Sequence, residues 1–268
     1  MATSKRTLPL KPRQFSAWQW VIAGGVLGLV VALIAFAPSR WLAAWVAGAS
    51  GGQVSLPDAR GSIWSGSSQL ALSGGAGSQG ATAMPGRLNW QLGPAWRGFE
   101  MMAQAPCCMA QPLRISVRLG WGGAVLVVQD HTSDWPAGLL AGLGTPWNTI
   151  AAQGNLTVAS KGLSLEWAEG RFSMAGSLQI DALEMASRLS TVNPIGSYRL
   201  LLEGGPTVRL KVQTLQGSLQ LSGEGQWVGG RLRFDGVASA PVERQDALSN
   251  LLNIIGRREG VRSIIKVG

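Results

Sequence analysis

From Gly52 onward, apolar and polar residues alternate in short segments that are separated by Gly, Pro, Asn or Ser. Residues 88–92, 208–213 and 231–235 follow this pattern. A period of two places successive side chains on opposite faces of a β-strand. Many strands with one apolar face each predict an antiparallel sheet that is solvated on one side. Its other side must contact a second sheet, the curled other half of the same sheet or an apolar ligand.

Several of these segments begin at a glycine, which is typical of consecutive hairpins: residues 86–90, 154–158, 217–221 and 230–234. The 37 glycines and the charged fraction of only 14% suit many strands joined by tight turns. We therefore expect a mainly β fold, with one long meander forming a curved antiparallel β-sheet of half-barrel, taco-like or sandwich-like form.

Two segments interrupt the alternation. In residues 135–150, Pro136 is placed to begin a short helix and residues 144–146 are placed to end it. Residues 241–256 have apolar side chains near helical spacing, acidic residues in the early turns and a terminal glycine. We expect this second segment to be the one C-terminal helix, followed by a last strand at residues 261–267.

Residues 18–37 form the only segment that is apolar enough to cross a bilayer, and they contain no charged residue. At 1.5 Å per residue, the segment is long enough for a hydrocarbon core of roughly 30 Å. Trp18 and Trp20 lie at one end and Trp41 follows the other, where amphipathic rings favour the boundary between lipid and water. The sequence therefore predicts a transmembrane helix.

The preceding tail has no acidic residue and four basic ones: Lys5, Arg6, Lys11 and Arg13. The positive-inside rule then places the N-terminus in the cytoplasm. A cleaved signal peptide is the competing interpretation, because residues 35–37 fit an A-x-A site, but the apolar region is long and Pro38 would hinder cleavage. Gly24 and Gly28 have the G-x-x-x-G spacing that lets two helices approach closely, although glycines are common in membrane helices generally.

We expect four regions: a basic tail at residues 1–17, the transmembrane helix at 18–37, a juxtamembrane linker at 38–52 and one β domain at 53–268. The formal net charge is +9, but most of it comes from the two termini, so the β domain is nearly neutral. This weakens any inference from charge to nucleic acid, because stacking on single strands needs aromatic residues combined with a basic groove.

No motif for catalysis or phosphate binding is present, and the single histidine, His131, has no evident nucleophile or metal-ligand partners. We therefore predict no enzyme activity, catalytic residue, cofactor or metal. The two cysteines, Cys107 and Cys108, are adjacent and cannot build a disulfide framework. They are interpreted as buried or loop thiols or as a vicinal disulfide, with a soft-metal site as the weaker alternative.

The chain resembles the type II secretion system protein N family (general secretion pathway protein N) of Gram-negative bacteria. The likeness covers nearly the whole chain and rests on the basic tail with its single anchor and on the order of these segments: residues 59–66, 142–149, 196–200, 221–234 and 247–256. It implies a bitopic inner-membrane protein whose periplasmic domain belongs to a trans-envelope machine exporting folded proteins. The family is not known for catalysis. Its β domain also resembles AsmA-like envelope proteins, whose curved sheets form a groove for lipid.

The hypothesis is a non-enzymatic secretion component that contacts other type II secretion subunits through sheet edges or an exposed apolar face. Trp227, Arg231, Arg233 and Phe234 form a candidate interaction surface. The alternative is an AsmA-like protein that binds lipid in an apolar groove of its sheet. Both hypotheses place the chain in the bacterial inner membrane, with the β domain in the periplasm.

Overall fold

The computed structural model describes residues 17–75, 77–78 and 80–268. The chain divides into two units, Met1–Ala37 and Pro38–Gly268. In the first unit, helix α1 (Ala17–Ala35) is apolar on all sides. None of the helices in the described part of the chain has the length and apolarity that a membrane crossing requires. The basic residues of the N-terminal tail lie outside the described residues.

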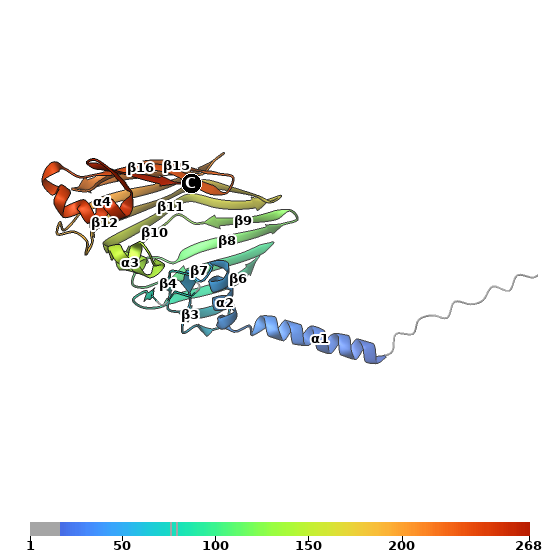
Figure 1. Ribbon diagram of the computed structural model, residues 1–268. Coiled ribbons are helices and arrows are strands. Elements are labelled where there is room, and N and C mark those ends of the chain that lie inside the picture. Colours follow the sequence, from blue (N-terminus) through green and yellow to red (C-terminus); the bar gives the residue numbers. More distant parts are fainter. Residues whose placement is uncertain (1–16, 76, 79) are drawn as a thin grey trace, which may run out of the picture. The chain divides into compact units, whose positions relative to one another are not determined.

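The second unit contains a 15-stranded sheet in which every strand pairing is antiparallel (Figure 1). From one edge to the other the order is β17-β18-β16-β15-β14-β13-β12-β11-β9-β8-β7-β6-β3-β2, and β10 also pairs with β11. The bounds are β2 (Arg60–Gly61), β3 (Ser65–Ser68), β6 (Leu88–Ala95), β7 (Gly98–Gln104), β8 (Leu113–Gly120), β9 (Gly123–Val128), β10 (His131–Pro136), β11 (Gln153–Ala168), β12 (Arg171–Ala186), β13 (Gly196–Gly205), β14 (Arg209–Gly217), β15 (Gln220–Val228), β16 (Arg231–Ser239), β17 (Arg257–Glu259) and β18 (Arg262–Val267).

A small second sheet has the order β1-β4-β5, with bounds β1 (Val54–Ser55), β4 (Ala71–Ser73) and β5 (Ala81–Ala83). The helices of this unit are α2 (Ser39–Ala49), the 3-10 helix η1 (Ala137–Leu143), α3 (Trp147–Ile150), the 3-10 helix η2 (Val242–Arg244) and α4 (Gln245–Ile255). The mainly β, antiparallel meander is confirmed. The sheet is open, and the sandwich-like form is not observed, because no second large sheet packs on it within the described residues (Figure 1).

The strands of the large sheet run between two unlike ends (Figure 1). At the helical end lie η1, α3 and α4, together with the long connections that contain them. At the open end lie the tight turns of the hairpins β6–β7, β8–β9, β11–β12 and β15–β16. Helices therefore cover one end of the sheet and leave the opposite end as a row of bare turns.

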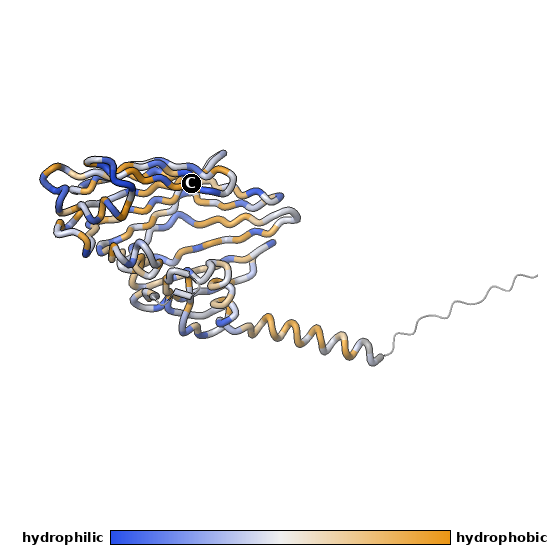
Figure 2. The backbone as a smooth tube through the Cα atoms, in the orientation of Figure 1, coloured by the Kyte–Doolittle hydropathy of each residue, from blue (hydrophilic) through white to orange (hydrophobic). Residues whose placement is uncertain are grey.

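The strand register places apolar residues opposite one another in rows across the sheet, and Figure 2 shows hydrophobic and hydrophilic residues alternating along several strands. Directly paired residues share a face. One such row crosses six strands: Leu178, Leu202, Leu210, Gly225, Phe234 and Val267. A second row crosses β8, β9, β11 and β12: Val117, Leu126, Leu165 and Met174. We call the face that carries these rows the apolar face.

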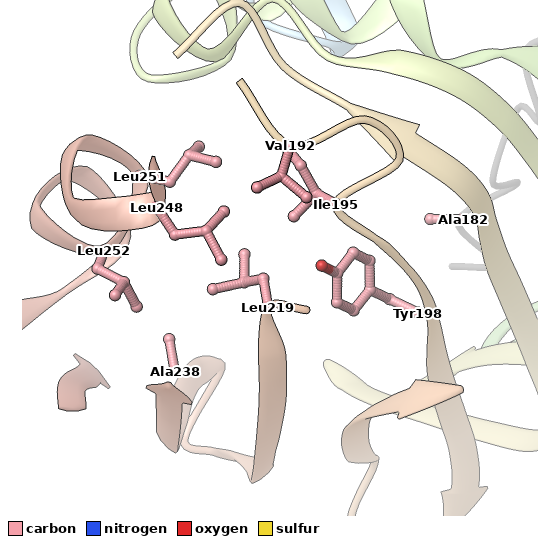
Figure 3. Close-up of a cluster of buried hydrophobic side chains, with 9 residues drawn as sticks. All are labelled: Ala182, Val192, Ile195, Tyr198, Leu219, Ala238, Leu248, Leu251 and Leu252. Carbon is pink, nitrogen blue, oxygen red and sulfur yellow. The ribbon is translucent and has the colours of Figure 1, made fainter. Parts of the chain in front are cut away.

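Helix α4 covers the apolar face at the helical end (Figure 3). Leu248, Leu251 and Leu252 have the i, i+3, i+4 spacing of one helix face and are almost fully buried. They pack with Ala238, Tyr198 and other residues of the sheet and its connections in one cluster. A second cluster forms around η1, where Leu139 packs with Met84 and with residues of the β7–β8 connection. Both hydrophobic clusters therefore lie at the same end of the sheet.

Leu252→Ala tests how strongly α4 holds this end. Because Leu252 is fully buried and its truncation leaves a cavity, we expect the free energy of unfolding to fall by about 2–5 kcal/mol. Ile254→Ala is the matched control, since Ile254 is on the same helix with 38% of its surface exposed, and it should change stability much less. Thermal or denaturant unfolding of the detergent-solubilised chain measures both, and equal effects would contradict this account of the core.

Candidate functional site

Most of the apolar face away from the helical end is partly exposed. Among the described residues, no helix or second large sheet lies over the strands there, so their side chains are shielded mainly by their neighbours in the same sheet. The partly exposed residues include Leu92, Ile115, Val117, Leu126, Leu165, Leu178, Leu200, Leu202, Leu210 and Leu232. A continuous apolar surface of this kind on a folded protein marks a site for a protein partner or a lipid.

The opposite face of the same strands is polar. Arg118, Glu166 and Glu203 occupy it beside the apolar residues that precede or follow them in the chain. An open hollow of about 770 Å³ is lined by polar residues such as Gln91 and Glu100 and by apolar residues such as Met102 and Val127. The two faces thus differ in chemistry, and consecutive residues such as Leu202 and Glu203 lie on opposite faces.

The edges of the large sheet are poor sites for adding a further strand. Its outermost strands are β2, with 2 residues, and β17, with 3 residues. Short edge strands present few free backbone groups, which is one way in which proteins avoid pairing at an edge. Of the two contact modes expected from the sequence, the structure therefore favours the apolar face over the edges.

The four residues of the candidate interaction surface divide between the two faces. Trp227 and Phe234 lie on the apolar face, where Trp227 is half-buried and Phe234 is buried. Arg231 and Arg233 are exposed and alternate with them on the polar face. The role of this group in binding stays a prediction.

Phe234 is buried because it lies over glycines of the neighbouring strand. A Cβ added at Gly223 would come within 2.4 Å of its ring, and a Cβ added at Gly225 within 3.0 Å. Trp90 has the same relation to Gly66, where the corresponding distance is 2.5 Å. Aromatic rings that cover glycines therefore fill gaps in the apolar face on both halves of the sheet, and the bare alternation pattern does not reveal these contacts.

Cys107 and Cys108 lie in the connection between β7 and β8, and a disulfide joins them in this structure. Cys108 is buried in the cluster around η1, and its carbonyl accepts a hydrogen bond from the backbone N–H of Asp134 at 2.8 Å. Cys107 is exposed. The pair thus belongs to the packing of the helical end and is remote from the row of bare turns.

His131 begins β10 opposite Ser160, and its Nε2 atom is buried without a hydrogen-bond partner. No group of three or more potential metal ligands occurs in the described part of the chain. Tyr198 is also buried with an unpartnered hydroxyl, and this burial raises its pKa. Neither residue has a charged or nucleophilic partner that would indicate catalysis.

The proposed anchor residues belong to two different units. Trp18, Trp20, Gly24 and Gly28 lie on α1, and the side chains of both tryptophans are exposed. Trp41 lies on α2 in the second unit and is exposed as well. Their role as a membrane anchor stays a prediction.

The polar face carries one well-shielded ion pair. Arg199 on β13 donates two hydrogen bonds of 2.7 Å to the carboxylate of Asp181 on β12, and Gln179 donates another at 2.9 Å. The hydrogen bonds from Arg199 lower the pKa of Asp181 below its ordinary value, although partial burial opposes them. The pair joins the neighbouring strands β12 and β13 on the polar face.

The fold and this surface define an open antiparallel β-sheet protein with one apolar face that is partly exposed. Residues 52–264 match the family model for type II secretion system protein N. The match extends from the segment before β1 into β18, so the chain belongs to this family, which supplies a component of the secretion machinery. No curated protein and no solved structure matches the chain.

Asp181→Asn tests the ion pair through the pH dependence of stability. Because the folded state has the lower pKa, the carboxylate stabilises the protein fully above its unfolded pKa of roughly 3.9, and this contribution disappears as pH falls through the folded value. We expect the wild type to melt at a higher temperature than the variant at pH 7, with a difference that shrinks below about pH 4. Asp235→Asn removes a more exposed pair with Lys266 at 4.0 Å and should have little effect at either pH. A difference for Asp181→Asn that does not depend on pH would contradict this assignment.

Proposed function

We propose that the chain is a non-enzymatic inner-membrane component of the type II secretion machinery whose periplasmic β domain contacts other subunits through its apolar face. The observation that carries this proposal is the half-exposed apolar surface over the middle of a single-layered sheet. When a partner covers hydrophobic side chains that are partly exposed to water, the free energy falls by roughly 25 cal/mol per Å² of apolar surface buried. Membership in the family supports another part of the same machine as that partner.

The proposed topology is a single pass through the inner membrane. Residues 1–17 would lie in the cytoplasm, residues 18–37 would span the bilayer, residues 38–52 would link the span to the domain, and residues 53–268 would lie in the periplasm. Support comes from the uncharged apolar run and from the basic residues that precede it. A tether of this kind suits a scaffold that must stay beside the other inner-membrane subunits.

Lipid binding in a groove of the sheet is the second candidate, and the same half-exposed face favours it. An acyl chain could lie along the row of leucines that crosses β12, β13 and β14. The two candidates differ in what the purified protein carries. Mass spectrometry should find reproducible bound lipid if the face serves as a groove, and no stoichiometric lipid if the face is reserved for subunits.

Photo-crosslinking in living cells tests the proposed contact directly. Leu202 and Glu203 are neighbours in sequence on opposite faces of β13, so a photoreactive amino acid at each position forms a matched pair. We expect Leu202 to crosslink to another secretion subunit and Glu203 to give much less product, because only the first lies on the apolar face. Positions 227 and 234 extend the same test to the candidate interaction surface.

Crosslinks from Glu203 alone would contradict the proposed face. Absence of protein crosslinks from Leu202, combined with bound lipid, would favour the second candidate. Normal export of the machine's substrates after deletion of the gene would count against a role in secretion altogether.

A further inference from the structure

The bare turns at the open end of the sheet expose aromatic side chains to an unusual degree. Trp96 lies in the turn between β6 and β7 with 91% of its surface exposed. Trp121 lies in the turn between β8 and β9 and is fully exposed. A tryptophan on a protein surface is usually covered at least in part, because its ring is the largest apolar group that a side chain can present to water.

The next hairpin in the sheet continues the series. Trp167 and Phe172 face each other across β11 and β12 just before the turn, with ring centroids 5.3 Å apart and about half of each side chain exposed. Three hairpins that are neighbours in the sheet therefore end in aromatic side chains. The helical end has only one half-exposed tryptophan, Trp147, among the described residues.

Arginines accompany these aromatic residues. Arg97 follows Trp96 in its turn, and Arg209 and Arg231 begin the strands that leave two further turns at the open end. Arg171 is paired with Glu169 at 3.0 Å in the turn of the β11–β12 hairpin, so that pair is neutral. A hollow of about 590 Å³ is lined by Trp96, Arg97, Arg118 and Trp167, and also by Glu166 and Glu169. Tryptophan beside arginine is the combination that suits the headgroup region of a bilayer with anionic lipids.

The chain also enters the second unit at this end. Pro38, the first residue of the unit, forms a bridge with Ser62 in the turn between β2 and β3. The next residues of that turn lead to Trp64, whose ring lies 6.4 Å from that of Phe99, near the start of β7 at the open end. The second unit therefore begins close to the aromatic turns of the same unit.

We propose that the open end of the sheet rests on the surface of a bilayer that contains anionic phospholipid, with Trp96 and Trp121 inserted at the lipid–water boundary. This goes beyond the proposed secretion role, because it assigns a lipid-surface contact to hairpin turns that are distinct from the apolar face. The contact places the helical end away from the membrane and leaves the apolar face free at the side. Contact at two separate turns also orients the domain relative to the bilayer.

Photolabelling from the lipid tests this contact with the full-length chain. The protein is reconstituted in nanodiscs of phosphatidylcholine mixed with phosphatidylglycerol, and a small share of the lipid carries a photoreactive group near the ester linkage. Labelled peptides are then mapped by mass spectrometry. We expect label on the peptides that contain Trp96 and Trp121 and none on peptides of α4, which lies at the helical end.

The double variant Trp96→Ser, Trp121→Ser should lose the label at both turns, whereas the control Trp147→Ser should keep it. Labelling of the turns should weaken in nanodiscs of phosphatidylcholine alone, because the arginines then lack an anionic partner; equal labelling would overturn the anionic preference. Peptides from residues 18–37 report separately on the anchor. Label at residues 18–37 with none at the turns would overturn this proposal and leave the proposed topology intact. Label at the turns with none at residues 18–37 would support this proposal and contradict the proposed topology.

Discussion

The cross-strand register is the constraint on which the rest of the structure depends. Because side chains alternate with a period of two, a slip of one residue would move the apolar residues of a strand to the polar face. A bulge in β11 shows how the register is kept where the partner strand changes. The strand pairs with β10 before Lys161 and with β9 from Ser164 onward. The N–H of Gly162, which has a positive φ of 58°, donates to the carboxylate of Asp130 at 2.6 Å in that gap.

The helices then divide the sheet into regions with different roles. Helix α4 and the η1 segment cover the apolar face at one end, and the two hydrophobic clusters there supply the packing that a single-layered sheet cannot provide for itself. The rest of the apolar face is stabilised only by strand pairing, and its side chains remain partly exposed to solvent. In a family that belongs to a multi-subunit machine, this uncovered face is the natural place for contact with other subunits. The packed end and the uncovered apolar face are thus different parts of one sheet.

Much of the fold could be predicted from the sequence, because alternation and turn residues are local signals. The strands at residues 88–92 and 231–235 and the helix near residues 245–255 follow from spacing alone. How the apolar face is covered could not be predicted, since that depends on contacts between segments distant in sequence. Two such features are the packing of Phe234 over glycines of the neighbouring strand and the exposure of Trp96. The sequence alone does not distinguish an aromatic residue that fills a gap in the sheet from one that is exposed in a turn.

We expect the apolar face to be uncovered in the isolated chain and covered in the assembled machine. Hydroxyl-radical footprinting of three methionines can distinguish these two states. Met101 lies on the apolar face, Met102 is its neighbour on the polar face, and Met84 is buried at the helical end. In the isolated chain, Met101 and Met102 should oxidise readily and Met84 should not. In the assembled secretion complex, Met101 should become protected while Met102 stays reactive. Protection of Met101 in the isolated chain, or its unchanged oxidation after assembly, would contradict the account.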